Sequence, residues 1–271
     1  MFRFLKQRRR QRLRAQPFPP AWRSIITGNL PIFRRLPPED QAELLGHVQV
    51  FLAEKRFEGC SSLELTDEIR VTIAAQACLL LLHRATDYYP ELTSILVYPS
   101  GYTSYEARHL EGNIWDEGGE PRLGQTARRL GSLVLAWDDA KRGAAHPSKR
   151  GAAHPSDGRN LVLHEFAHQL DYEEFQTDGA PALATRAEYL TWARVMSREF
   201  AALQSAGETG TSTVLDTYGA TNPAEFFAVV TEAFFERPRA LRGSHPELYA
   251  QLARFFRQDP SRYSAEATTT P

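Results

Sequence analysis

The sequence predicts an α+β fold that is mostly helical, contains a small sheet, and is preceded by a helical N-terminal region. Apolar residues recur at helical spacing over most of the chain. Two short runs, residues 92–100 and 131–139, are instead rich in branched and aromatic residues and end in turn signals, as strands do. With 271 residues, of which 42% are hydrophobic and 24% charged, the chain is long enough to bury the core of one large domain.

Charge and cysteine content exclude several classes of protein. The 32 basic and 33 acidic residues leave a formal net charge of -1, so the molecule as a whole has no nucleic-acid-binding signature. Cys60 and Cys78 are too few for a disulfide framework, which favours a reducing compartment and predicts a cytoplasmic location. The apolar run 71–82 is shorter than the roughly 18 residues of a transmembrane segment, and we expect a buried helix there.

Residues 1–20 form a basic N-terminal arm, in which seven basic residues lie between Arg3 and Arg14. A secretory signal is excluded because no run of roughly 7–15 apolar residues follows. Basic clusters of this kind sometimes bind membrane surfaces or nucleic acid, but more often they are solvated. We therefore expect a solvated helix or a flexible arm before the first packed helix.

A single domain is predicted over residues 21–260, and its first half contains two helices. One spans about residues 39–55. Its apolar face consists of Leu44, Leu45, Val48, Phe51 and Leu52. The next is expected to begin near Thr66, whose hydroxyl can cap the helix, and to run to about His83. Between the two predicted strands, the segment 102–128 is polar and Gly-rich, which indicates a hairpin or a long loop.

Residues 141–156 consist of the octapeptide KRGAAHPS repeated once without change. The repeat is far shorter than the roughly 20–50 residues of a solenoid unit, and its composition is that of a loop. We do not expect His146 and His154 to bind metal, because flexible loops position ligands poorly. Beyond the stretch 160–172, three further helices are predicted, at 186–206, 222–238 and 245–258, followed by a disordered tail at 261–271.

The stretch NLVLHEFAHQLDY, residues 160–172, carries a candidate metal site. On a helix, residues four apart lie on one face, so His164 and His168 can present two imidazoles to one ion. Glu165 lies beside them, where it can take a proton from an attacking water. This spacing is that of the HExxH zinc motif, and the apolar flanks of the stretch favour a buried helix. Two core histidines bonded to backbone carbonyls are the less favoured alternative.

A catalytic zinc site needs a third protein ligand and an open position. The only histidine downstream of the motif, His245, lies in a turn signal and is expected at the surface, so a carboxylate is favoured. Glu225 is the best candidate, at the start of a predicted helix. Asn222, Pro223 and Glu225 also match a capping box, in which the glutamate merely bonds to the backbone. Glu232, two turns further on, is the alternative ligand.

Together with this motif, several segments resemble the Mlc titration factor A family of bacterial zinc metallopeptidases, which have a gluzincin-type site. The resemblance covers most of the chain, and its most specific part combines the HExxH motif with a tyrosine seven residues before a glutamate. These segments are FEGCSSLELTDEIRVTIAAQACLLLL, ILVYPS, LVLAWDDA, DGRNLVLHEFAHQLD, TYGATNPAEFFAVVTEAFFERP and HPELYAQLARFFRQDP. The duplicated loop departs from the family pattern, and the segment 102–128 matches it poorly.

The resemblance implies a zincin-like metallopeptidase domain that binds Zn2+ and hydrolyses peptide bonds, with aminopeptidase-like activity. By this resemblance, His164, His168 and Glu225 would be the zinc ligands and Glu165 the general base. Tyr218 would assist near the scissile carbonyl. Family members are also associated with binding a transcriptional repressor of glucose uptake, so a regulatory binding protein that sequesters such a repressor is the alternative function.

Two further expectations concern the surroundings of the motif. We expect the strand at 133–137 to lie at the edge of the cleft, where an extended peptide can add as a further strand. Asp171, three residues beyond His168, can accept a hydrogen bond from a ligand histidine and fix its tautomer. It can equally lie near the helix end on a solvated face, and the sequence leaves these two alternatives open.

Overall fold

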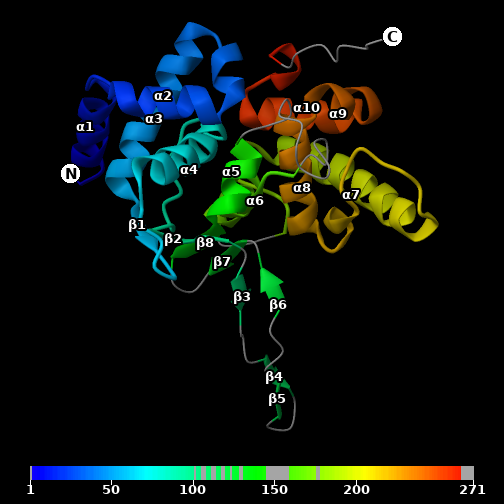
Figure 1. Cartoon of the computed structure of the whole chain (residues 1–271). Helices are drawn as coiled ribbons and strands as arrows, with labels where there is room; N and C mark the ends of the chain where they lie inside the picture. Colours follow the sequence, from blue (N-terminus) through cyan, green and yellow to red (C-terminus); the bar gives the residue numbers. More distant parts are fainter. Residues whose placement is uncertain are drawn as a thin grey trace, which may run out of the picture.

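The computed structural model describes residues 2–100, 102–104, 108–110, 114–116, 120–122, 124–127, 131–144, 159–174 and 178–263. Residues 145–158, which include His146 and His154 of the duplicated loop, lie outside the described residues, as does the tail from residue 264. Helices dominate the fold, and the small sheet lies at the lower edge of the helical body in Figure 1. The predicted α+β class, mostly helical with a small sheet, is confirmed.

The N-terminal region is helical, as predicted. Its elements are α1 (Phe2–Arg14), α2 (Pro20–Asn29), a 3-10 turn η1 (Pro31–Arg35), α3 (Pro38–Glu54) and α4 (Asp67–Leu79). Helix α3 buries most of the apolar face that the sequence indicates, including Leu44, Val48 and Phe51. Helix α4 is buried from Val71 to Leu79, and the Thr66 hydroxyl accepts a hydrogen bond from the Ile69 amide at 3.3 Å, which makes it the predicted cap.

The basic arm is a helix with one docked face. Arg10 is 4% exposed, and its guanidinium donates to both carboxylate oxygens of Glu54, at 2.8 and 2.7 Å. Arg10 also pairs with Asp87, which lies in the segment after α4. Arg8, Arg9 and Arg12 remain exposed, although Arg9 still reaches the Ala53 carbonyl of α3 at 3.4 Å. The arm is therefore a packed part of the N-terminal region along one face and solvated along the other.

Four strands form the sheet, in the order β1 (Arg56–Gly59), β2 (Ser94–Tyr98), β8 (Ser132–Ala136) and β7 (Gly124–Ala127). The first three are mutually parallel, and β7 runs antiparallel to β8. The two predicted strands are confirmed as β2 and β8, which pair from Ser94 with Ser132 to Tyr98 with Ala136. Their branched side chains Ile95, Val97, Leu133 and Leu135 are buried.

The expectation that the 133–137 strand forms the edge of the cleft is wrong. Strand β8 is an inner strand, because β2 takes one side of its backbone and β7 takes the other over Ser132–Leu135. Its hydrogen-bonding groups are therefore already paired, and no further strand can add there. The partner β7 comes from the polar segment that precedes β8, where no apolar alternation in the sequence indicates a strand.

That polar segment forms the predicted hairpin. Strand β3 (Tyr102–Ser104) pairs antiparallel with β6 (Glu120–Arg122), and β4 (Arg108–Leu110) pairs with β5 (Ile114–Asp116) further out. Figure 1 shows these four strands extending away from the helical body, below the sheet.

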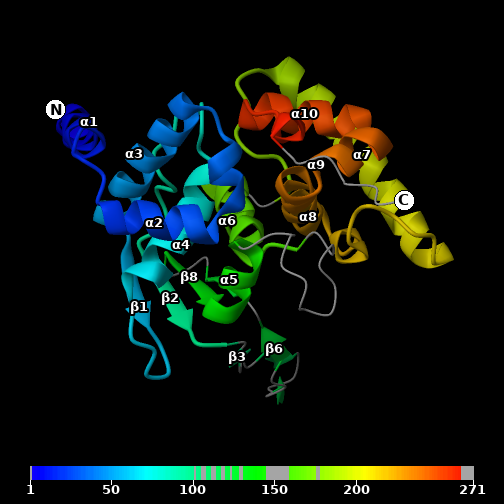
Figure 2. The same ribbon diagram turned by 45° about the horizontal axis from the view of Figure 1, so that its top comes forward.

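The remaining elements are helical. They are α5 (Trp137–Ala144), α6 (Leu161–Asp171), η2 (Tyr172–Glu174), α7 (Arg186–Thr209), η3 (Thr217–Ala220), α8 (Pro223–Glu236), α9 (Pro238–Ser244), α10 (Pro246–Phe256) and η4 (Pro260–Arg262). Both views show α6 near the centre, with the N-terminal helices on one side and α7 to α10 on the other (Figures 1 and 2). Ser261, at the start of the predicted tail, is buried.

Helix α6 is anchored in the core by its apolar face. The Phe166 ring lies 4.8 Å from the ring of Tyr89 and 5.7 Å from that of Phe51, measured between centroids. Leu163 and Leu170 are also buried. The N-terminal region thus fixes the position and rotation of α6, and α8 packs beside it. Within the described ranges, no helix is both long and apolar enough to cross a membrane.

Candidate metal centre

The start of α6 is set by its cap. Asn160 has extended backbone, and its side-chain oxygen accepts a hydrogen bond from the Leu163 amide at 3.0 Å. One turn apart along the helix, the rings of His164 and His168 lie with centroids 4.9 Å apart. Their Nε2 atoms are separated by 3.2 Å. The two imidazoles therefore converge on one point, as the spacing of the motif predicts.

Glu225 reaches the same point from α8. The Asn222 side chain caps this helix by accepting from the Glu225 amide at 3.0 Å, and Pro223 occupies the first helical position. The Glu225 carboxylate turns instead toward the histidines, with Oε2 at 3.0 Å from His164 Nε2 and 3.5 Å from His168 Nε2. Its backbone takes part in the cap while its side chain joins the cluster.

One potential ligand atom from each of His164, His168 and Glu225 lies within 4.8 Å of the other two. Two imidazole nitrogens and one carboxylate oxygen form the donor set that zinc takes at catalytic sites with three protein ligands. The residues present therefore fit a divalent ion of this kind.

Glu232 lies on the Nδ1 side of the His164 ring, opposite the Nε2 side that Glu225 approaches. Its Oε1 lies 2.7 Å from His164 Nδ1, and its Oε2 accepts a hydrogen bond from the Asn160 amide. A carboxylate on Nδ1 fixes the orientation of the ring and leaves Nε2 directed at the cluster. The sequence leaves Glu225 and Glu232 open as alternatives, and the structure gives them different positions: Glu225 meets Nε2 and Glu232 meets Nδ1.

The electrostatics of the cluster are those of an ion-pair network. Burial alone would lower the pKa of His164, but hydrogen bonds to Glu225 and Glu232 outweigh it and raise this pKa to about 10. Burial alone would raise the pKa of Glu225, but hydrogen bonds to His164 and His168 hold the pKa of its carboxyl far below the usual range. A proton on His164 thus balances the carboxylates when no cation does so.

Asp171 and His168 each retain a buried polar atom without a partner in the described part of the chain. These atoms are Asp171 Oδ1 and His168 Nδ1. The other oxygen of Asp171 accepts a hydrogen bond from the Gly179 amide at 3.1 Å, and burial raises the pKa of Asp171 to about 6. Asp171 is therefore buried at the helix end and not solvated, and it makes no hydrogen bond to His168 here.

The two further predicted residues border the cluster. Glu165 is 6% exposed, between the two histidines in the chain. Tyr218 lies on η3, with its ring centroid 6.1 Å from that of His164 and 53% of the residue exposed. Asp216 caps η3 by accepting from the Tyr218 amide at 2.9 Å, and its carboxylate also pairs with Arg159 just before α6. This pair joins η3 to the start of α6.

A second cluster of potential ligands lies elsewhere and is not predicted by any motif. His83 Nε2 is 3.1 Å from Asp40, and His83 Nδ1 is 3.2 Å from Glu43. This group offers one imidazole and two carboxylates, whereas the first cluster offers two imidazoles and one carboxylate. His245, expected at the surface, is partly buried and lies 2.8 Å from Glu199.

Comparison with known proteins agrees with the geometry. A sequence profile described as glucose-regulated metallo-peptidase M90 matches residues 4–257. An uncharacterized protein of Synechocystis sp. is 39% identical over 256 residues, which cover 93% of this chain and 89% of that protein. Mlc titration factor A of Yersinia pestis and that of Yersinia pseudotuberculosis are each 30% identical over 237 residues, covering 86% of this chain and 83% of their own. The chain belongs to the glucose-regulated metallo-peptidase M90 family.

Proposed function

We propose that the protein is a zinc-dependent peptidase of the zincin-like, gluzincin type, in which His164, His168 and Glu225 hold the ion. Membership of a metallopeptidase family implies a metal ion. The observation that carries the proposal is the convergence of two Nε2 atoms and one carboxylate oxygen within 4.8 Å, next to the buried Glu165. Zinc held by such a set lowers the pKa of water to about 7 and polarises a carbonyl.

The protein's own groups perform the proton transfers in this proposal. Glu165 takes a proton from the attacking water and delivers it to the amine that leaves, as a general base and then a general acid. Tyr218 lies beside His164 at the surface side of the cluster, where its hydroxyl can donate a hydrogen bond to the carbonyl oxygen as that oxygen gains negative charge. Glu232 is a positioning residue, because it acts through the His164 ring.

Metal loading tests the assignment of the third ligand. Glu225→Ala is expected to purify with far less than one zinc per chain and to lose hydrolysis of a peptide substrate. Glu208→Ala is the matched control, because it removes a glutamate from an exposed position on α7. Chelated wild-type protein should regain activity when zinc is added. Full zinc content in Glu225→Ala would refute the ligand set.

The resemblance favours aminopeptidase-like action on short peptides. Hydrolysis of a peptide with a free N-terminus should then exceed that of the same peptide with an acetylated N-terminus. Equal rates on both would favour an endopeptidase with the same metal centre. A cytoplasmic location is part of this proposal and fits the two free cysteines, Cys60 and Cys78.

The names of two relatives support a second candidate function. Both Yersinia proteins are called Mlc titration factor A, which suggests that this chain sequesters a transcriptional repressor of sugar uptake. One variant distinguishes the two functions. Glu165→Gln should abolish hydrolysis while leaving capture of a repressor intact, and a protein that only binds would show no hydrolysis even in the wild type.

A further inference from the structure

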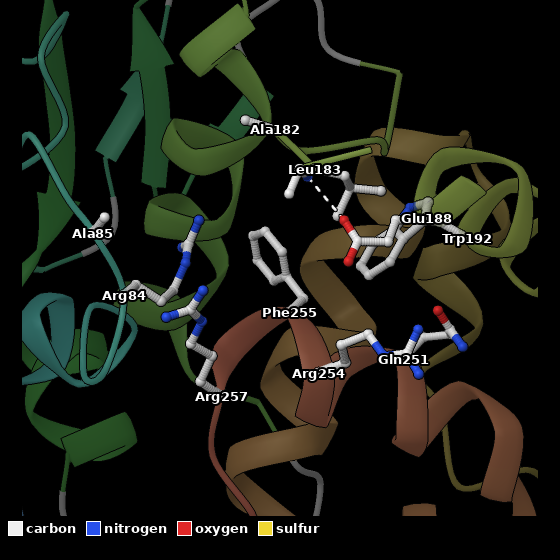
Figure 3. A pocket seen from close by; sticks show the side chains of 11 residues that line it. Arg84, Ala85, Ala182, Leu183, Glu188, Trp192, Gln251, Arg254, Phe255 and Arg257 are labelled. Carbon is white, nitrogen blue, oxygen red and sulfur yellow. Dashed lines mark hydrogen bonds between the residues drawn. The ribbon is translucent and has the colours of Figure 1, made fainter. Parts of the chain in front are cut away.

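A cavity of about 190 Å3 lies between the start of α7, helix α10 and the turn that follows α4 (Figure 3). None of the candidate metal ligands lines it. Trp192 and Phe255 give it an aromatic wall, with ring centroids 5.6 Å apart. The Trp192 indole is fixed because its N–H donates to the Gly179 carbonyl at 2.9 Å.

The charges that line this cavity are predominantly positive. Arg84, Arg254 and Arg257 contribute guanidinium groups, against the single carboxylate of Glu188. One oxygen of that carboxylate, Oε2, accepts hydrogen bonds from the Ala184 and Thr185 amides at 2.9 and 3.1 Å in the capping box of α7. One carboxylate against three guanidinium groups leaves the lining with an excess of positive charge.

Arg84 is the most constrained of the three arginines. Its guanidinium lies over the Phe255 ring at 4.1 Å, and its Nη1 is buried with no hydrogen-bond partner among the described residues. Burial lowers the pKa of Arg84; the nearby Glu173 opposes this effect, and Arg257 adds to it. A buried guanidinium N–H without an acceptor is costly, and an anion bound in the cavity would satisfy it.

Arg257 supplies a second cation next to Arg84. Figure 3 shows both guanidinium groups on one side of Phe255, with Arg254 on the other side. Arg257 donates to the His83 carbonyl at 3.3 Å, and the nearby carboxylate whose charge acts on Arg84 is that of Glu173. Two adjacent cations without a bridging anion repel each other, and an anion placed between them removes this repulsion.

We propose that this cavity binds a small organic phosphate, whose phosphate group is held by Arg84 and Arg257 and whose carbon skeleton lies on Phe255 and Trp192. The planar fork of a guanidinium matches phosphate oxygens in a bidentate manner. A dianion balances two guanidinium groups, whereas a carboxylate balances only one. A cavity of about 190 Å3 has room for several water molecules and therefore for a small organic anion.

Calorimetric titration of the full chain with glycerol 3-phosphate tests the proposal. Wild type should bind it, while glycerol gives no heat and lactate, a three-carbon carboxylate, binds at least tenfold more weakly. Arg84→Met and Arg257→Gln should each weaken binding roughly tenfold or more. The matched control is Arg194→Gln, an exposed arginine of α7 that does not line the cavity.

Glu225→Ala distinguishes this cavity from the metal centre, and it should bind glycerol 3-phosphate as wild type does. Arg257 is exposed, so its variant keeps the test valid if Arg84→Met fails to fold. The proposal is overturned if wild type does not bind glycerol 3-phosphate at millimolar concentration, or if wild type and Arg257→Gln bind it equally well. It is also overturned if lactate binds as tightly as glycerol 3-phosphate, or if Glu225→Ala no longer binds glycerol 3-phosphate.

Discussion

Glu232 Oε1 lies 2.7 Å from His164 Nδ1, on the side of the ring that faces away from Glu225 and His168. The same carboxylate accepts a hydrogen bond from the Asn160 amide at the start of α6. One side chain of α8 therefore fixes both the histidine and the beginning of its helix. It leaves Nε2 of His164 directed at the point where the other two candidate ligands meet.

Replacing Glu232 should weaken metal binding although Glu232 is not a ligand. In Glu232→Gln the amide has one oxygen, which can accept from His164 or from Asn160 but not from both. Loss of such a partner typically lowers metal affinity about 10- to 100-fold. Zinc competition with a chromophoric chelator measures the change, and Glu208→Gln is the control. An affinity equal to that of wild type would show that Glu232 does not orient His164.

Tyr218→Phe should reduce turnover without reducing zinc content. The hydroxyl donates only as negative charge develops on the carbonyl oxygen, so its loss is expected in kcat, by about 10²- to 10³-fold, with little change in KM. Steady-state kinetics and zinc analysis on the same preparation separate the two quantities. A variant with unchanged kcat would remove Tyr218 from the mechanism.

Gly179→Ala should destabilise the fold by about 1–3 kcal/mol or more. Gly179 has φ of +78°, and an added Cβ would lie 2.4 Å from the backbone oxygen of Pro223, where α8 begins. Gly207→Ala, in the last turn of α7 with nothing near its Cβ, should instead stabilise the protein by up to about 0.5–1 kcal/mol. Urea unfolding compares the two. A tolerated Gly179→Ala would show that this contact is not tight.

Lys55 should make stability depend on pH in the alkaline range. Its ammonium is buried and donates to the Tyr89 carbonyl at 2.7 Å and to that of Leu92, and burial lowers its pKa to about 8. Between pH 8 and about 10.4 the unfolded chain binds more protons at this residue, so its contribution to the free energy of unfolding increases with pH, by about 3 kcal/mol in total.

The measurement is the difference in unfolding free energy between wild type and Lys55→Met at several pH values. The free energy of unfolding of wild type, minus that of Lys55→Met, should increase from pH 8 to 10.5 and stay constant from pH 6 to 7.5. A flat difference across the whole range would mean that Lys55 titrates normally.

Local features of the site follow from the sequence, but their pairing does not. The motif and the apolar flanks of residues 160–172 predict α6, and the Asn222–Pro223 cap predicts the start of α8. Glu225 and Glu232 are seven residues apart and share a helix face, so spacing alone cannot tell which meets Nε2. The rotation of α8 against α6 decides this, and it depends on core packing between segments far apart in the chain.

Two further features depend on long-range partners in the same way. Strand β7 is held by backbone pairing with β8 and lies in a polar, Gly-rich segment, so side-chain alternation does not reveal it. Arg10 is one of many arginines in the basic arm, and it is buried because Glu54 and Asp87 lie opposite. Charge patterning shows a basic helix but not which arginine finds carboxylates 44 and 77 residues away.

The most direct test of the hydrolytic zinc centre is the paired measurement of zinc content and peptide hydrolysis on Glu165→Gln. The substitution leaves all three proposed ligands in place and removes only the group that moves protons. The variant should retain about one zinc per chain, as in wild type, and its rate of hydrolysis should be lower by about 10²- to 10⁴-fold. Undiminished hydrolysis in this variant, or a wild-type protein that binds no zinc, would contradict the hydrolytic zinc centre.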